Sequence, residues 1–194
     1  MNIMKNLGIV VLAGFLTACA HPIVISPDPT TLAKASERID RNVGLVITQA
    51  DKGVQITTPG GGGDNISYYP YKDLEFGIYS TLSSVFSNVV PLNALDEKQK
   101  IAQQNLGAIF LPTIQTTSSS ESMFTWPPTF FSIMIDYRVV DPSGEQLSSG
   151  RVLGEGRAEF SEFKSDFALA AKRAGTDALN KLKDKLQSSH AIRK

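Results

Sequence analysis

The sequence predicts an α+β domain, with a mostly antiparallel sheet and helices packed on one face. Residues 130–140 alternate apolar and polar side chains, which is typical of a half-buried strand. Two longer segments, near 70–90 and 165–186, carry apolar residues at helical spacing. The predicted order of strand, strand, helix, short helix, strand, hairpin and helix is that of an α+β fold.

The first predicted elements are two strands, Val43 to Thr48 and Val54 to Thr58, which are rich in β-branched residues. Residues 51–53 end in glycine, and we expect them to join the two strands as a hairpin. The four glycines at 60–63 are too costly in backbone entropy for regular structure and predict a flexible surface loop. The following helix begins near Pro70 and ends before Pro91.

A second, shorter helix is predicted from Ala94 to Gln104, with Asn105 and Gly107 as its C-terminal cap signals. Ala108 to Ile114 is predicted to be a buried strand, followed by a polar loop at 116–129. The strand 130–140 then leads into a turn at 141–144 and returns as the partner strand 147–160.

The last predicted helix spans 165–186 and carries an alanine-rich apolar stripe. One face of the strand before it consists mostly of small residues and carries Gly150, Val152, Gly154, Gly156, Ala158 and Phe160. We therefore expect this helix to pack closely on that strand as part of the core.

The N-terminus has the pattern of an export signal. A short start with one lysine, Lys5, precedes an apolar run at 7–16, which is about half the length of a membrane span. It ends in Leu16-Thr17-Ala18-Cys19, and Cys19 is the only cysteine of the chain. This ending resembles the lipobox of bacterial lipoproteins. The resemblance implies cleavage before Cys19, which becomes an N-terminus acylated with chains such as palmitate.

These features predict the domain organisation. Residues 1–18 form the signal peptide, 19–42 the lipidated N-terminus and a proline-interrupted tether, 43–187 one periplasmic domain, and 188–194 a flexible tail. Ala20 follows the cysteine, whereas lipoproteins retained in the inner membrane usually carry aspartate there. The resemblance thus implies anchoring in the outer membrane, on the periplasmic face.

The domain itself resembles small periplasmic lipoproteins of the curli-secretion and YajG-like kind. The resemblance covers about residues 43–186. It rests on the order of the elements, the run Leu106 to Pro112, the hairpin turn after Val140 and the alanine-rich last helix. It implies an α/β binding or assembly module and carries over no functional residues.

The sequence offers little for catalysis, and we predict no enzyme activity, no cofactor and no metal site. His21 lies in the predicted tether and His190 in the tail, so a serine–histidine pair or a histidine-rich metal site is not expected. Carboxylates alternate with arginines along the strands, which favours cross-strand ion pairs over glycosidase-type acid–base chemistry. The glycine run lacks the lysine of a phosphate-binding loop. Equal numbers of acidic and basic residues, 19 each, indicate no nucleic-acid binding.

The best candidates for a functional contact are Met123, Phe124 and Trp126, large apolar residues in a loop rich in serine and threonine. Such residues are enriched at interfaces and membrane boundaries. Two interpretations stay open: the loop is a partner contact, or it folds back and covers an edge of the core.

Together these observations predict a non-enzymatic lipoprotein that acts as a binding or assembly accessory, attached to the membrane by its lipid and to an envelope protein of unknown identity. One alternative is a structural subunit of an envelope secretion, transport or motility complex. Another is an envelope enzyme acting on peptidoglycan or polysaccharide.

Overall fold

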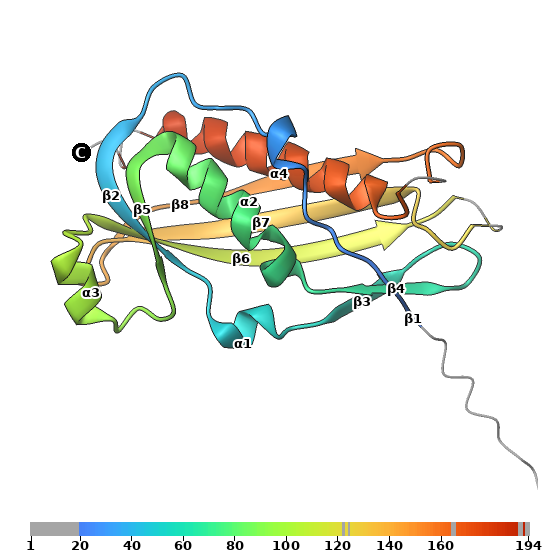
Figure 1. Cartoon of the computed structure of the whole chain (residues 1–194), viewed down its shortest axis with the longest axis horizontal. Helices are drawn as coiled ribbons and strands as arrows, with labels where there is room; N and C mark the ends of the chain where they lie inside the picture. The colour runs from blue at the N-terminus through green and yellow to red at the C-terminus, as the bar shows by residue number, and fades with distance from the viewer. Residues whose placement is uncertain (1–19, 122, 124, 164–165, 190–191, 193–194) are drawn as a thin grey trace, which may run out of the picture.

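Two helices lie side by side on one face of a long twisted sheet, and a smaller sheet extends from one edge of this layer (Figure 1). The computed structural model describes residues 20–121, 123, 125–163, 166–189 and 192. In chain order the elements are β1 (Ala20–Pro22), a 3-10 turn (Pro29–Thr31), β2 (Ile39–Val46), α1 (Gln49–Lys52), β3 (Ile56–Pro59), β4 (Asn65–Tyr68), α2 (Pro70–Val85), β5 (Phe86–Leu92), α3 (Lys98–Gln103), β6 (Ala108–Ser119), β7 (Phe130–Val140), β8 (Gln146–Arg157) and α4 (Leu169–Gln187).

The larger sheet has five strands in the order β5-β2-β6-β7-β8. Strands β5, β2 and β6 are parallel, whereas β6, β7 and β8 form an antiparallel meander. The predicted α+β class is confirmed, but the sheet is mixed rather than mostly antiparallel. The reason is that β2, β5 and β6 are separated by helical connections, which allow parallel pairing.

The smaller sheet has the order β1-β4-β3, with β1 parallel to β4 and β3 antiparallel to it. The predicted hairpin between 43–48 and 54–58 is therefore wrong. Residues 49–52 form α1 instead of a turn, because Thr48 and Asp51 cap its first turn reciprocally. The strand that follows α1 joins the smaller sheet.

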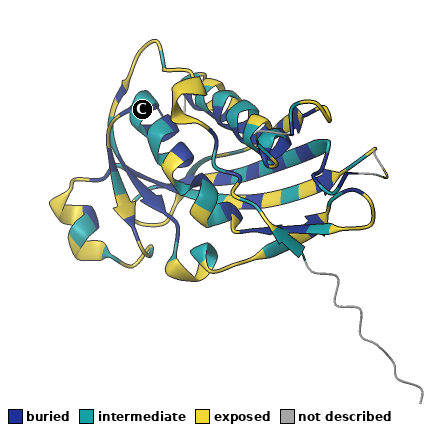
Figure 2. Ribbon diagram, turned by 45° about the vertical axis from the view of Figure 1, so that its right-hand side comes forward, coloured by how far each residue is buried: buried dark blue, intermediate teal, exposed yellow. Residues whose placement is uncertain are grey.

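Most of the core lies between the larger sheet and helices α2 and α4. Figure 2 shows buried and exposed residues alternating along the long strands, as the pattern at 130–140 predicts. A smaller apolar cluster lies on the opposite face of the sheet, where Ile101 of α3 packs against Val46 and Ile109. The helices are thus not all on one face.

Several element ends differ from the sequence prediction. Helix α2 ends at Val85, and Phe86–Leu92 forms the edge strand β5, in which Pro91 is tolerated. Strand β6 continues to Ser119, which shortens the predicted loop. The sequence pattern places Phe160 on the face of the last strand that packs on the helix, but β8 ends at Arg157 and Phe160 is exposed.

The predicted seam between the last helix and the strand before it is present and very tight. Gly154, Gly156 and Ala158 face α4, whose residues Ala170, Ala174 and Ala178 are buried. A Cβ atom at Gly154 would lie 2.2 Å from the carbonyl oxygen of Ala174, and one at Gly156 would lie 2.0 Å from that of Ala170. The helix backbone thus rests almost directly on the strand.

Side chains of α4 also cover the free edge of β8. Three hydrogen bonds join them: Arg173 Nη1 donates to Arg157 O (2.7 Å), Glu155 N donates to Asp177 Oδ2 (2.9 Å), and Lys181 Nζ donates to Leu153 O (2.8 Å). The bonded residues are spaced four apart along α4 and two apart along β8. These spacings correspond to similar distances along the helix and the strand, so the hydrogen bonds can repeat in step. Backbone groups of the edge strand are therefore occupied by the helix.

The structure places the predicted tether against the domain. Of the 19–42 segment, residues 20–42 are described: they begin with β1, and Ile25 is fully buried, with its N–H donating to Asp73 Oδ2 at 3.1 Å. At the other end, Ile192 is buried and its carbonyl accepts from Arg41. The proline-rich composition indicates a free linker, but Ile23 and Ile25 pack with the main core, and Pro27 lies close to Gly77 of α2 and Gly175 of α4. The predicted signal peptide 1–18 and Cys19 lie outside the described residues.

We predict that Gly154→Ala lowers the free energy of unfolding by about 3 kcal/mol, because the methyl group has only the α4 backbone to displace. Chemical denaturation measures the change. Gly53→Ala is the control: Gly53 has an ordinary right-handed φ of −80°, and its added Cβ would meet only ordinary contacts. Equal stability of both variants would show that α4 does not rest on β8 in this way.

Candidate functional site

The loop 120–129, where the sequence places the candidate contact residues, divides into an exposed part and an anchored part. The Met123 side chain is 82% exposed, whereas Trp126 is half-buried against the core. Phe124 lies outside the described residues. For the described residues, the two interpretations of the loop thus apply to different positions: Met123 projects to solvent and Trp126 covers a core edge.

Trp126 joins the loop to two distant parts of the chain. Its ring stacks on His21 of β1, with centroids 4.3 Å apart, and meets the Phe167 ring at 4.8 Å. The Nε2 atom of His21 also lies 3.6 Å from the carboxylate of Asp64. The expectation that His21 belongs to a free tether is therefore wrong, because β1 holds it beside Trp126.

The glycine run is not the free surface loop that its composition indicated. Gly61 is buried, and its N–H donates to the carbonyl oxygen of Trp126 at 2.9 Å. A Cβ atom at Gly61 would lie 1.8 Å from the carbonyl oxygen of Thr125. Gly62 and Gly63 have positive φ angles of 66° and 88° and make the turn itself. Glycine is needed here for close backbone approach as well as for the turn.

A third segment reaches the same end of the molecule after β8. Phe160 is 66% exposed and Phe167 is 50% exposed. A pocket of about 240 Å³ separates Phe160 from the loop 120–129, and Thr125 lines it with a buried hydroxyl that has no hydrogen-bond partner among the described residues. We call Met123, Trp126, Phe160 and Phe167 the apolar tip.

An ion pair fixes the segment that carries Phe160 to helix α4. Arg173 donates to both carboxylate oxygens of Glu162, at 2.7 and 3.1 Å, and the N–H of Glu159 donates to the same carboxylate. These hydrogen bonds lower the pKa of Glu162 from 4.5 to about 2. The carboxylate is therefore ionised at any physiological pH.

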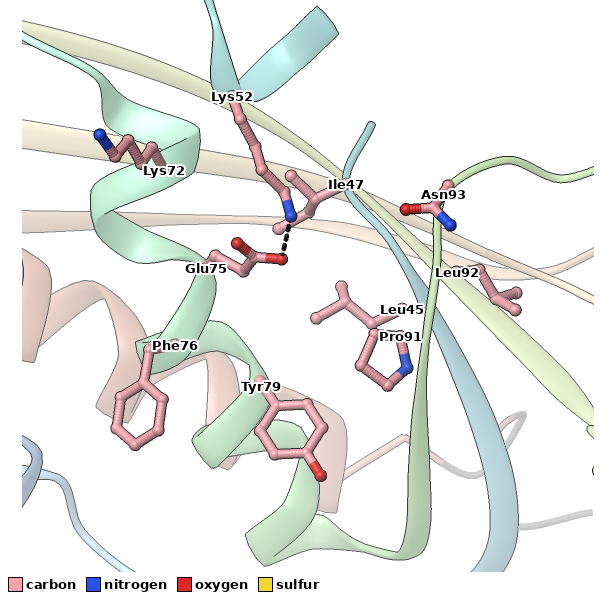
Figure 3. Close-up of a pocket in the computed structure, with 10 residues that line it drawn as sticks. All are labelled: Leu45, Ile47, Lys52, Lys72, Glu75, Phe76, Tyr79, Pro91, Leu92 and Asn93. Carbon is pink, nitrogen blue, oxygen red and sulfur yellow. Dashed lines mark ion pairs between the residues drawn. The ribbon is translucent and has the colours of Figure 1, made fainter. Parts of the chain in front are cut away.

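A separate pocket of about 320 Å³ lies between α2, β2 and the end of β5 (Figure 3). Leu45, Ile47 and Leu92 are its buried apolar residues, and Phe76 and Tyr79 of α2 extend along it. An ion pair of 2.6 Å between Lys52 and Glu75 lies at its rim. The pocket suits an apolar group next to a polar one.

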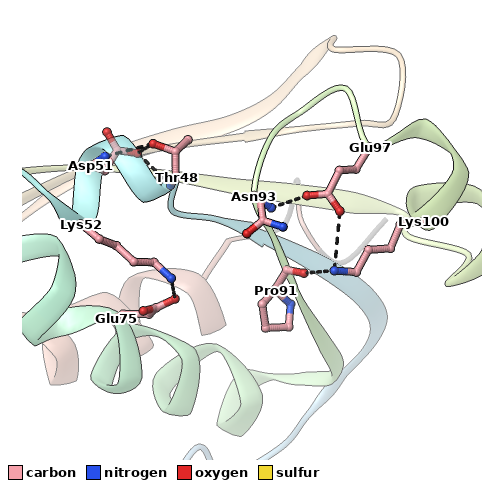
Figure 4. A network of polar contacts seen from close by, with 8 residues as sticks. All are labelled: Thr48, Asp51, Lys52, Glu75, Pro91, Asn93, Glu97 and Lys100. Atoms are coloured by element: carbon pink, nitrogen blue, oxygen red, sulfur yellow. Dashed lines mark hydrogen bonds and ion pairs between the residues drawn. The ribbon is translucent and has the colours of Figure 1, made fainter.

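Polar contacts hold the two loops beside this pocket (Figure 4). The carboxylate of Glu97 accepts from the backbone N–H of Asn93, and Lys100 Nζ donates to the carbonyl oxygen of Pro91 at 2.7 Å. Thr48 and Asp51 fix α1 on the other side. Sequence reasoning missed the pocket, since its lining comes from four elements, β2, α1, α2 and β5, and from two connecting residues, Ile47 and Asn93, which only the fold brings together.

One carboxylate of the larger sheet forms a cross-strand ion pair. Asp136 of β7 lies opposite Arg151 of β8, and the arginine donates two hydrogen bonds to it, at 2.6 and 3.1 Å. The predicted cross-strand pairing is confirmed for these two residues. Among the residues that the structure describes, no group of three histidine, cysteine or acidic side chains is placed to hold a metal ion. None of the described helices is long and apolar enough to cross a membrane.

The chain matches no known protein family and no curated protein. One similar solved structure is a DUF330 family protein from Xanthomonas campestris, which has 10% sequence identity. The match covers 86% of this chain and 93% of that chain, with a TM-score of 0.47. Another is a candidate neuraminyllactose-binding hemagglutinin homolog from Helicobacter pylori, with 12% sequence identity. The match covers 82% of this chain and 89% of that chain, with a TM-score of 0.48. A third is a candidate lipoprotein from Caulobacter crescentus, with 12% sequence identity. The match covers 48% of this chain and 79% of that chain, with a TM-score of 0.31. Similarity at this level assigns no activity to the present chain.

We predict that Gly61→Ala destabilises the protein by about 2 kcal/mol and shifts the emission of Trp126, because the added methyl group displaces the backbone of the loop. Trp126 is the only tryptophan, so its fluorescence reports on this loop alone. Gly107→Ala is the control, since its Cβ would meet only the Arg41 side chain at 3.4 Å or more. An unchanged emission and stability for Gly61→Ala would restore the free-loop interpretation.

We also predict a specific acid sensitivity. Because the pKa of Glu162 falls from 4.5 to about 2 on folding, its contribution to stability is complete above about pH 4.5 and is lost as the pH falls towards 2. In Arg173→Gln the pKa should rise towards 4.5, which an NMR titration of the Glu162 carboxyl measures. Arg151→Gln, which removes the partner of Asp136, should leave that pKa near 2. A pKa near 4.5 in the unmodified protein would contradict the prediction.

Proposed function

We propose that the protein is a lipid-anchored, non-enzymatic binding or assembly accessory of the bacterial outer membrane, facing the periplasm. The observation that carries the proposal is the junction between the lipobox and the fold. Cys19 closes the lipobox, and Ala20 is the first residue of β1. An acylated Cys19 would therefore anchor the folded domain itself.

Simple chain geometry supports a close anchor. Consecutive Cα atoms are about 3.8 Å apart, so Cys19 is one step from a residue paired with Asn65 of β4. Each buried acyl CH₂ contributes about 0.8 kcal/mol, so two or more chains hold a protein stably on a membrane. The lipid would thus fix both the location and one end of the domain.

Binding rather than catalysis is supported by the chemistry of the described surface. The pocket beside α2 offers apolar residues and the paired Lys52 and Glu75, and the prominent carboxylate of the sheet is paired with Arg151. These arrangements favour holding a ligand or a protein partner. The partner in this proposal is an envelope protein, and the pocket beside α2 offers a surface for it.

We predict that Cys19→Ser abolishes incorporation of labelled palmitate and leaves an uncleaved precursor or a soluble protein. Membrane fractionation and mass measurement of the N-terminus detect both effects. Ala20→Asp should move the mature protein from the outer to the inner membrane, because aspartate after the cysteine is typical of inner-membrane lipoproteins.

Ala20→Ser provides the control for a polar residue at the start of β1, and it should fractionate like the unmodified protein. Thermal melting of all three variants separates misfolding from mislocalisation. Normal cleavage and normal membrane recovery of Cys19→Ser would refute the lipid anchor. Recovery of the unmodified protein in the inner membrane would refute the assignment to the outer membrane, and unchanged sorting of Ala20→Asp would refute only the role of residue 20 in sorting.

A further inference from the structure

Two segments that are far apart in the sequence present exposed apolar side chains at one end of the molecule, namely the loop 120–129 after β6 and the segment 158–167 after β8 (Figure 1). The glycine turn 60–63 packs against the loop and supports it. Met123, Phe160 and Phe167 are 82%, 66% and 50% exposed. Exposed apolar residues gathered in this way mark a contact surface rather than ordinary surface composition.

This end of the molecule is also where the chain enters the fold. His21 follows Ala20 in β1 and stacks on Trp126, which in turn contacts Phe167. His21, the residue next to Ala20, is therefore connected through the Trp126 ring to Phe167, an exposed residue of the apolar tip. A lipid attached to Cys19 brings this end of the domain, and not the opposite end, to the membrane.

The charges around the apolar tip pair with one another. The carboxylates of Glu121, Glu162 and Asp166 lie 3.6, 2.7 and 2.8 Å from their basic partners Arg157, Arg173 and Lys172. Among the residues of this end that the structure describes, the pairing leaves no concentrated positive field that would attract anionic lipids. The chemistry therefore favours apolar contact with a zwitterionic lipid surface.

We propose that the apolar tip is the membrane-contacting surface of this domain, with Met123, Phe160 and Phe167 entering the interfacial region of the leaflet that holds the acyl chains of Cys19. The inference rests on the proposed lipid anchor and adds an orientation to it. A lipid surface is the occupant, because the anchor is one residue from β1 and holds this end against lipid. Half-buried tryptophan suits the same boundary, where one edge meets apolar groups and the other meets water.

The test uses the acylated full-length protein in vesicles of phosphatidylcholine and phosphatidylethanolamine, with a fraction of the lipids brominated on their acyl chains. Trp126, the only tryptophan, is the reporter. We expect brominated lipids to quench its fluorescence strongly and expect the quenching to be unchanged by added salt, since apolar contact is not screened. Replacing part of the lipid with phosphatidylglycerol should change little.

The variant is Met123→Ser with Phe160→Ser, since neither residue makes a ring contact with Trp126 in the structure. We expect the quenching to fall several-fold while the melting temperature stays the same. The control is Leu95→Ser with Leu153→Ser, which removes two exposed leucines from other surfaces and should leave the quenching unchanged.

The outcomes separate this inference from the anchor. If the protein stays on the vesicles and Trp126 is not quenched, the domain stands away from the membrane and the inference is wrong, although the anchor remains. If quenching persists in the tip variant, contact is made elsewhere and the inference is also wrong. If Cys19 carries no lipid, the proposed anchor fails, and the inference then survives only if the unmodified chain binds the vesicles with Trp126 quenched.

Discussion

The close contact between the backbone of α4 and β8 is the constraint on which the rest of the domain depends. Gly154 and Gly156 let the helix approach until its carbonyl groups touch the strand, and the alanine stripe gives the helix a matching flat face. At this distance, charged side chains of α4 reach the edge of β8 and occupy its backbone groups. Helix α2 then packs beside α4, where Gly77 and Gly175 leave room for Pro27 of the N-terminal segment.

A second consequence concerns the end of the molecule that carries the apolar tip. Because α4 is fixed, Arg173 can hold Glu162, two residues after Phe160, in a defined position. Phe167 meets Trp126, and Trp126 meets His21. The apolar tip is thus built from loops, but ring contacts and an ion pair tie these loops to helix and sheet.

The sequence alone predicts the elements whose signals are local. The strand 130–140, the turn at Gly144 with its φ of 93°, and the small-residue face of β8 all follow from periodicity or turn chemistry. The pairing of strands cannot be predicted from local signals in the same way. Strand β3 has the composition of a hairpin partner of β2, yet it pairs with β4 in the other sheet. The role of the glycine run and of His21 also depends on a loop more than 60 residues away, which no local pattern reveals. The apolar tip could be foreseen only in part: Met123 and Trp126 stand out in a polar loop, whereas Phe160 was assigned to the core face.

The N-terminal segment also has a consequence for how the chain folds. Thr31 meets Thr176, Ala33 donates to Asn180, and Arg41 donates to Ile192, so contacts of this segment span nearly the whole chain. Contacts between such distant residues form only after a long loop is closed, and they slow folding. Residues 25–41 therefore have no complete surface to pack against until α4 has been made and has docked. The first part of the domain to be synthesised is among the last to become ordered, and the loss of the final helix would release it again.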